Sequence, residues 1–227
     1  MKEAKISEIF LSLQGEGIYL GTRQLFIRFY GCNLSCAFCD TKLDSYGSFT
    51  RSSLMSRILE HSEPYHSISF TGGEPLLQAD FIRDFLHEYR KFYDKTIYLE
   101  TNGTLHGGIT KVIDYVDIIA MDFKLPSSTA EVAHWELHEK FLKVAKRKEV
   151  FVKAVVTPAT SVSDILRMRN IIVRISSDIA VVLQPVTPPE GGDRINESVT
   201  EYFKTLIGEK MKRVEIIPQV HRILGIK

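Results

Sequence analysis

Residues 25–41 read LFIRFYGCNLSCAFCDT. The first six are apolar or aromatic apart from Arg28, which is typical of a strand buried on both faces of a parallel sheet. Directly after this predicted strand, Cys32, Cys36 and Cys39 lie within eight residues, and they are the only cysteines in the sequence. An odd number of closely spaced cysteines is a poor disulfide framework. We therefore expect an α/β protein whose first buried strand leads into a metal-binding or redox loop.

Strand-like and helix-like segments alternate along the rest of the chain. Short runs rich in β-branched and aromatic residues predict strands at 25–30, 67–71, 96–100, 117–123, 150–156, 178–184 and 213–217. Apolar residues at helical spacing predict helices at 52–61, 79–91, 109–115, 136–148, 162–169 and 197–207. The alternation predicts right-handed βαβ crossovers and a parallel sheet, closed or partly closed. Residues 1–227 are expected to form one domain, with the Pro- and Gly-rich segment 184–194 as a loop inside it.

Composition narrows the classes of partner. The formal net charge is +1, whereas proteins that bind nucleic acids or anionic membranes usually present a basic surface. No uninterrupted apolar run approaches the roughly 20 residues that span a bilayer. The first ten residues mix charges of both signs and lack the apolar segment of a signal peptide. We expect a cytoplasmic protein with neither a nucleic-acid nor a membrane partner.

Polar or glycine-rich residues follow the predicted strands at their carboxyl ends. These segments are 32–41, TGGEP (71–75), ETNG (100–103), Lys124, Gln184 and PQVH (218–221). In α/β barrels and open parallel sheets, binding sites form at this edge. The sequence therefore predicts that six separate segments meet at one site.

The cysteine spacing, Cys32-x3-Cys36-x2-Cys39, favours an iron–sulfur cluster. An ordinary cubane has four cysteine ligands, so three would leave one iron open to a small molecule. Structural zinc needs four protein ligands, and the first histidine after the loop is His61. Structural zinc and unliganded cysteines remain as alternatives.

CxxxCxxC after a first strand, with Phe38 before the third cysteine, resembles the radical S-adenosylmethionine (SAM) superfamily. TGGEP at 71–75 resembles that superfamily's GGE segment, whose backbone meets the SAM amino group. The resemblance implies a [4Fe-4S] cluster on the three cysteines, with SAM on the open iron and a 5′-deoxyadenosyl radical that abstracts a substrate hydrogen. The cofactor carries the chemistry, and the protein positions it.

Further segments along the whole chain are similar to the 7-carboxy-7-deazaguanine synthase family. They are IFLSLQGEG (9–17), FIRFYGC (26–32), CDT (39–41), ETNGT (100–104), DFKLPSS (122–128), LQP (183–185) and PQVHRILGIK (218–227). The resemblance implies a partial (β/α)6-type barrel and a lyase-type rearrangement of 6-carboxy-5,6,7,8-tetrahydropterin to 7-carboxy-7-deazaguanine, with loss of ammonia, in deazapurine (queuosine-type) biosynthesis. It also implies Mg²⁺ as a cofactor and a flavodoxin- or ferredoxin-type electron donor. The oligomeric state stays open, a homodimer being one arrangement.

The family's binding residues map onto matching positions, with no residue singled out as a catalytic acid or base. SAM contacts are implied at Phe38, Asp40, Gly73, Asp122, Phe123, Lys124 and Gln184. Substrate contacts are implied at Leu13, Gln14, Gly15, Glu16, Arg28, Thr71, His221 and Lys227. Thr41 is the implied Mg²⁺ ligand. Residues 122–124 read DFK where many relatives have Ser-Pro-Lys, which departs from the family pattern.

Single residues also have plainer interpretations. Arg28 shares a strand face with Phe26, and a buried guanidinium needs a partner, either the substrate carboxylate or a carboxylate of the protein such as Glu16 or Glu100. Lys124 could form an ordinary ion pair. His134 and His138, four residues apart, are expected on an exposed helix face.

Two other functions compete with the synthase. One is a radical SAM activase that installs a glycyl radical on a partner enzyme. The other is a non-enzymatic iron–sulfur or zinc module.

Overall fold

The computed structural model describes residues 3–39, 41, 43–188, 193–220 and 225. Within them, nine strands form a single sheet in the order β3-β1-β2-β4-β5-β6-β7-β8-β9. The strands are β1 (Ala4–Leu13), β2 (Arg23–Phe29), β3 (Gly47–Phe49), β4 (Ser67–Gly72), β5 (Thr96–Thr101), β6 (Ile118–Asp122), β7 (Glu149–Val156), β8 (Ala180–Pro185) and β9 (Val214–Ile216). From β2 to β9 each neighbouring pair is parallel. The expected α/β class with a partly closed, mainly parallel sheet is confirmed.

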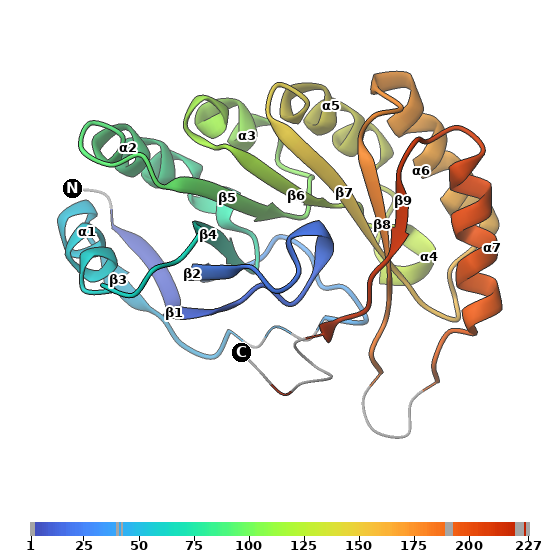
Figure 1. The fold of residues 1–227 in the computed structure, drawn as a ribbon, viewed down its shortest axis with the longest axis horizontal. Helices are drawn as coiled ribbons and strands as arrows, with labels where there is room; N and C mark the ends of the chain where they lie inside the picture. The colour runs from blue at the N-terminus through green and yellow to red at the C-terminus, as the bar shows by residue number, and fades with distance from the viewer. Residues whose placement is uncertain (1–2, 40, 42, 189–192, 221–224, 226–227) are drawn as a thin grey trace.

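Helices cover the outer face of this curved sheet (Figure 1). They are α1 (Arg51–Leu59), α2 (Ala79–Tyr89), α3 (His106–Val112), α4 (Pro126–Thr129), α5 (Trp135–Ala145), α6 (Val162–Ile175) and α7 (Glu197–Gly208). Short 3-10 turns lie at Gly17–Tyr19, Pro75–Gln78 and Ile113–Tyr115. Side chains of Thr50, Ser161 and Asn196 accept backbone hydrogen bonds at the starts of α1, α6 and α7, which satisfies donors that a helix leaves open.

Apolar side chains fill both sides of the sheet. The main core lies between the strands and the outer helices, and a smaller inner cluster contains Tyr98, Ala120, Phe151 and Val182. Burial on both faces explains the nearly continuous apolar runs of the parallel strands.

The structure corrects the sequence prediction at several elements, including the short helix α4, which was not predicted, and α3, which covers His106–Val112 instead of 109–115. β1 and β3 were not predicted, and both pair antiparallel at one edge of the sheet. The pairing of β1 with β2 shifts register between Ile6 and Glu8, and most of β1 is only half-buried, so its alternating pattern is weak. Helix α6 extends to Ile175, beyond the predicted end at 169, because Ile171 and Ile172 continue its buried face. Among the described helices, none is long and apolar enough to cross a membrane.

Candidate active site

A cavity of about 590 Å³ lies at the carboxyl ends of the parallel strands. Its walls include the loop after β1, the cysteine loop after β2, and residues at or near the ends of β4 to β8. Each of the six segments predicted to meet contributes to its lining, the last of them through Gln219. This convergence is therefore confirmed. It follows from the parallel sheet, which brings the carboxyl ends of its strands to one edge.

Cys32, Cys36 and Cys39 all line this cavity as free thiols. The loop that carries them is hydrogen-bonded to the end of α4, because the Ala37 N–H donates to the Thr129 carbonyl (2.9 Å). Burial raises the pKa of Cys36 to about 11 and raises the pKa of Cys32 as well. The thiolates that a cluster requires therefore need the charge of bound iron, which deprotonates coordinating thiols.

Three cysteines without a fourth cysteine in the sequence suit a cubane with one open iron better than a structural zinc ion, which takes four protein ligands. In the part of the chain that the structure describes, no three or more His, Cys, Asp or Glu side chains are grouped to hold a metal ion. A single zinc would draw its sulfurs to within roughly 4 Å of one another, since Zn–S bonds are about 2.3 Å long. A cubane binds each thiolate through a different iron, so three thiols on one short loop suit it.

The glycines of TGGEP let the end of β4 pack against the start of the cysteine loop. The Glu74 N–H donates to the Gly31 carbonyl (2.9 Å), so the two segments lie directly side by side. A Cβ on Gly73 would lie 2.3 Å from the Gly31 oxygen and 2.9 Å from the Cys32 Cβ. Only glycine fits at this position without moving the backbone that carries Cys32.

Glu74 is fully buried next to the cavity, and sequence reasoning did not single it out. Its carboxylate accepts hydrogen bonds from the Leu76 N–H (3.0 Å), the Thr101 hydroxyl (2.9 Å) and the Asn102 N–H (2.7 Å). Burial raises the pKa of Glu74 to about 7. The Asn102 side chain in turn donates to the Asn33 Oδ1 (2.9 Å), so this network reaches into the cysteine loop.

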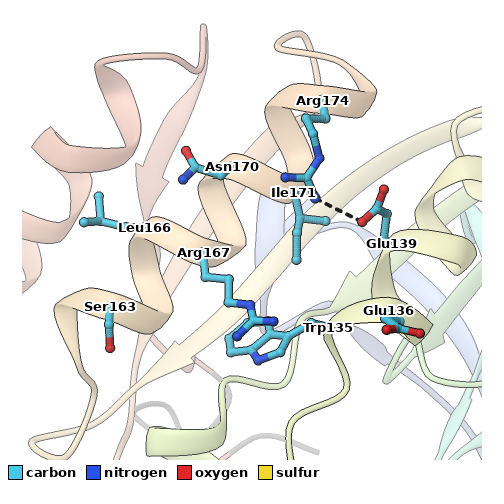
Figure 2. A pocket seen from close by; sticks show the side chains of 9 residues that line it. All are labelled: Trp135, Glu136, Glu139, Ser163, Leu166, Arg167, Asn170, Ile171 and Arg174. Atoms are coloured by element: carbon cyan, nitrogen blue, oxygen red, sulfur yellow. Dashed lines mark hydrogen bonds and ion pairs between the residues drawn. The ribbon is translucent and has the colours of Figure 1, made fainter.

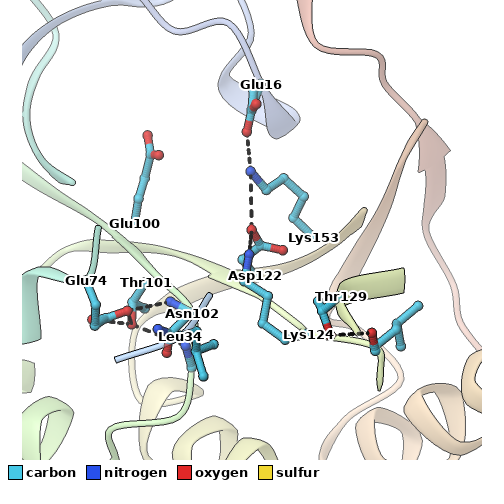
Figure 3. Close-up of polar contacts among 12 residues, drawn as sticks. Glu16, Leu34, Glu74, Glu100, Thr101, Asn102, Asp122, Lys124, Thr129 and Lys153 are labelled. Atoms are coloured by element: carbon cyan, nitrogen blue, oxygen red, sulfur yellow. Dashed lines mark hydrogen bonds and ion pairs between the residues drawn. The ribbon is translucent and has the colours of Figure 1, made fainter. Parts of the chain in front are cut away.

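Four charged groups form a row across the inner side of the sheet (Figure 3). The Lys124 Nζ lies 2.6 Å from the Asp122 Oδ2, and the Lys153 Nζ lies 3.8 Å from the same oxygen. Lys153 also forms an ion pair with Glu16. Burial would raise the pKa of Asp122, but the two lysines outweigh it and hold that pKa below its usual range. Lys153 was missed by the sequence analysis, although a single charge within VFVKAVV (150–156) is a usable signal.

The residues expected to bind SAM mostly line the cavity. They are Phe38, Gly73, Asp122, Lys124 and Gln184. Phe123 does not, because side chains alternate along the strand and its ring instead packs against His138 and Trp135 on the helix side. Both amide atoms of Gln184 and the Asp122 Oδ1 are buried without a hydrogen-bond partner among the described residues. Such orphaned polar atoms in a cavity wall suit a polar ligand.

The described residues expected to bind substrate lie at the end of β1, in the loop after it, and on β2 and β4. Leu13, Gln14, Gly15, Glu16, Arg28 and Thr71 all line it. The Gln14 amide donates to Glu100 (2.7 Å), and the Thr71 hydroxyl donates to the same carboxylate (3.1 Å). The protein partner of Arg28 is neither Glu16 nor Glu100. Its Nε lies 3.3 Å from a Glu8 oxygen, and its guanidinium lies over the Phe10 ring.

Thr41 also lines the cavity. Asp40, His221 and Lys227 lie outside the described residues. The expectation of an exposed helix face for His134 and His138 is wrong: His134 is half-buried just before α5, and His138 is fully buried with its Nε2 3.1 Å from the Asn102 carbonyl oxygen. The sequence could not show that the Asn102 loop packs over this part of α5.

A second cavity, of about 520 Å³, lies between α5 and α6 (Figure 2). The Arg167 guanidinium lies over the Trp135 ring, 4.8 Å from its centroid, and Arg174 pairs with Glu139 at 3.0 Å. It contains none of the predicted site residues.

Comparison with known proteins agrees with this arrangement. The family model of the Radical SAM superfamily matches residues 26–157. The chain is 36% identical to a 7-carboxy-7-deazaguanine synthase of Geobacter sulfurreducens, over 98% of this chain and 97% of that protein. It is 31% identical to a protein of the same name from Methanothermobacter thermautotrophicus, over 100% and 99% of the two chains. The crystal structure of QueE from Escherichia coli has a similar fold, with a TM-score of 0.64, 21% identity and coverage of 96% and 95%.

Proposed function

Because the chain belongs to the radical SAM superfamily and, within it, to the 7-carboxy-7-deazaguanine synthase family, we propose that it converts 6-carboxy-5,6,7,8-tetrahydropterin to 7-carboxy-7-deazaguanine with loss of ammonia. One observation carries the proposal. The three cluster thiols, the Asp122–Lys124 pair and the polar groups around Arg28 all line one cavity. Its volume of about 590 Å³ falls in the usual range for small-molecule sites.

The [4Fe-4S] cluster is held by Cys32, Cys36 and Cys39, with no fourth cysteine in the sequence. When bound, the cluster and SAM supply the radical that starts the rearrangement. The reducing electron comes, in this proposal, from a flavodoxin- or ferredoxin-type protein. A reducing cytoplasm suits free thiols and such a donor.

The wall formed by the ends of β6 and β8 suits SAM. Lys124 and Asp122 offer one cation and one anion, which complement the carboxylate and amino groups of the methionine part. The Gln184 amide, whose donor and acceptor atoms lack a partner among the described residues, can hydrogen-bond to the nucleoside part. Phe38 and Gly73, the other described residues expected to bind SAM, line the same cavity near the cysteine loop.

The opposite wall suits a carboxylated pterin. The planar guanidinium of Arg28 can hold the substrate carboxylate through two parallel hydrogen bonds. Gln14, Glu16 and Thr71 bring amide, carboxylate and hydroxyl groups that match the donors and acceptors on the edge of a pterin ring. Thr41 supplies an oxygen ligand for Mg²⁺, whose shell would otherwise come from water and substrate oxygens.

An anaerobic turnover assay tests the proposal. Reconstituted protein, SAM, a reductant and the carboxypterin should give 7-carboxy-7-deazaguanine together with 5′-deoxyadenosine. A Cys36→Ala variant, which cannot hold the cluster, serves as the control. Release of 5′-deoxyadenosine without any deazaguanine product would refute the proposed substrate.

A further inference from the structure

The inward face of β7 contacts the loop after β1 at three successive positions. The Tyr19 hydroxyl donates to Glu149 (2.5 Å), Gly17 packs on the Phe151 ring, and Glu16 pairs with Lys153. Glu149, Phe151 and Lys153 are two residues apart along the strand, so they share one face. The loop therefore lies along β7, although 130 or more residues separate the hydrogen-bonded partners in the sequence.

The backbone of this loop permits the close approach. Gly17 has a φ of +67°, and a Cβ there would lie 2.7 Å from the Phe151 ring. The aromatic contact therefore sets how near the loop comes to β7. The ion pair between Glu16 and Lys153 then sets the position of the carboxylate, since Lys153 is only 12% exposed and needs a charged partner.

Glu16 and its neighbour Gly15 also tie the loop to the segment after β9. The Gln219 amide donates to the second oxygen of Glu16 (3.2 Å), and the Val220 N–H donates to the Gly15 carbonyl (3.0 Å). Gln219 accepts from the Thr187 N–H (3.0 Å) in the loop after β8. Lys153 contacts both Glu16 and Asp122, and thus joins the substrate side of the cavity to its SAM side.

We propose that Lys153 is a positioning residue for substrate binding, which acts by fixing the Glu16 carboxylate and the loop 13–17 against β7. The inference rests on the proposed function, in which Glu16 contacts the pterin. Lys153 needs no contact with the substrate itself. Its effect on substrate affinity should therefore depend on Glu16 being present.

A double-variant cycle tests this dependence. The holoenzyme with SAM but without reductant is titrated with 6-carboxytetrahydropterin by calorimetry. Lys153→Met should weaken substrate binding about 10- to 100-fold, the range expected for coupled charges in contact. In a Glu16→Gln background the same change should have little further effect, and Lys153→Arg should restore part of the affinity. Lys212→Met, which removes an exposed ion pair with Asp178, should change nothing.

Two outcomes would overturn the inference. One is parental affinity in Lys153→Met. The other is an equal loss in the Glu16→Gln background, which would mean a direct ligand contact or a general structural role.

Hydrogen exchange separates this inference from the proposed function. Lys153→Met should speed amide exchange in residues 13–22 and leave exchange in α6 unchanged. Lys212→Met should leave exchange unchanged in both segments. If the parent protein fails to bind the carboxypterin but this loop still loosens in Lys153→Met, the proposed substrate is wrong, whereas the finding that Lys153 fixes the loop against β7 stands. Unchanged exchange in the loop would refute that role.

Discussion

The Nε2 of His138 lies 3.1 Å from the backbone carbonyl oxygen of Asn102. His138 belongs to α5 and is fully buried, with its ring 4.2 Å from that of Phe123. Asn102 follows β5 and lines the candidate active site. This contact therefore connects the outer helix layer to the cavity wall. Burial lowers the pKa of His138 to about 3, so the ring is neutral at neutral pH.

This buried ring makes stability depend on pH. Below the ordinary histidine pKa of 6.5, His138 binds a proton in the unfolded chain but stays neutral in the folded protein. The free energy of unfolding therefore falls as the pH falls from about 6.5 towards 3. Lowering the pH from about 7.5 to 5.5 should therefore reduce the free energy of unfolding by about 1.4 kcal/mol through His138 alone. Urea unfolding at both values should show this loss in the parent and in His87→Gln, an exposed control, but not in His138→Gln. An equal loss in all three proteins would contradict the assignment.

Gly73 is predicted to tolerate no side chain. Gly73→Ala would place a methyl group 2.3 Å from the Gly31 oxygen, and overpacking of this kind costs about 1–3 kcal/mol. Because the displaced backbone carries Cys32, iron binding should fall as well. Gly208→Ala, at the end of α7 with open space around it, should keep parental iron binding and should not lower the free energy of unfolding. Chemical unfolding and iron analysis measure the two effects, and a parental result for Gly73→Ala would show that the loop can shift freely.

Three thiols should hold one cubane. Reconstituted parent protein should contain about four irons, and alanine at Cys32, Cys36 or Cys39 should abolish the cluster, because each thiolate serves a different iron. Ser35→Ala in the same loop is a suitable control. Iron and sulfide analysis with absorption spectra decides the matter, and full loading of the triple alanine variant would rule out this site.

Arg28 should affect substrate turnover more than SAM cleavage. Arg28→Lys keeps the charge but loses the planar fork, and loss of a desolvated pair costs about 2–5 kcal/mol. Glu8→Gln is the matched control, since Glu8 is the ion-pair partner of Arg28 in the structure. Product formation is compared with 5′-deoxyadenosine release. If Glu8→Gln impairs turnover as strongly as Arg28→Lys, the guanidinium acts through its structural ion pair.

Thr41 should influence the Mg²⁺ requirement alone. Thr41→Ala removes one oxygen ligand, so half-maximal turnover should need more Mg²⁺ while the cluster content stays at the parental level. Thr205→Ala, on the surface of α7, should behave like the parent. A parent enzyme whose turnover does not depend on metal would refute this role.

Local sequence was sufficient for several features. The three cysteines lie on one short loop, so their spacing alone brings the thiols together. Apolar runs identified the parallel strands β2 and β4 to β8, because strands that are largely buried on both faces carry few polar residues. The same argument could not find β1, whose half-exposed residues and register shift disturb the alternation.

The sequence by itself determined the cysteine loop, the βα alternation and the edge of the sheet where the site forms, because each depends on neighbours along the chain. Only the tertiary structure decided which charges meet. Lys153 pairs with Glu16, 137 positions away, and Glu74 accepts from Asn102, 28 positions away. Only folding could turn Phe123 towards His138. A buried charge is stable only beside its partner, and that partner is supplied by the arrangement of strands in the sheet.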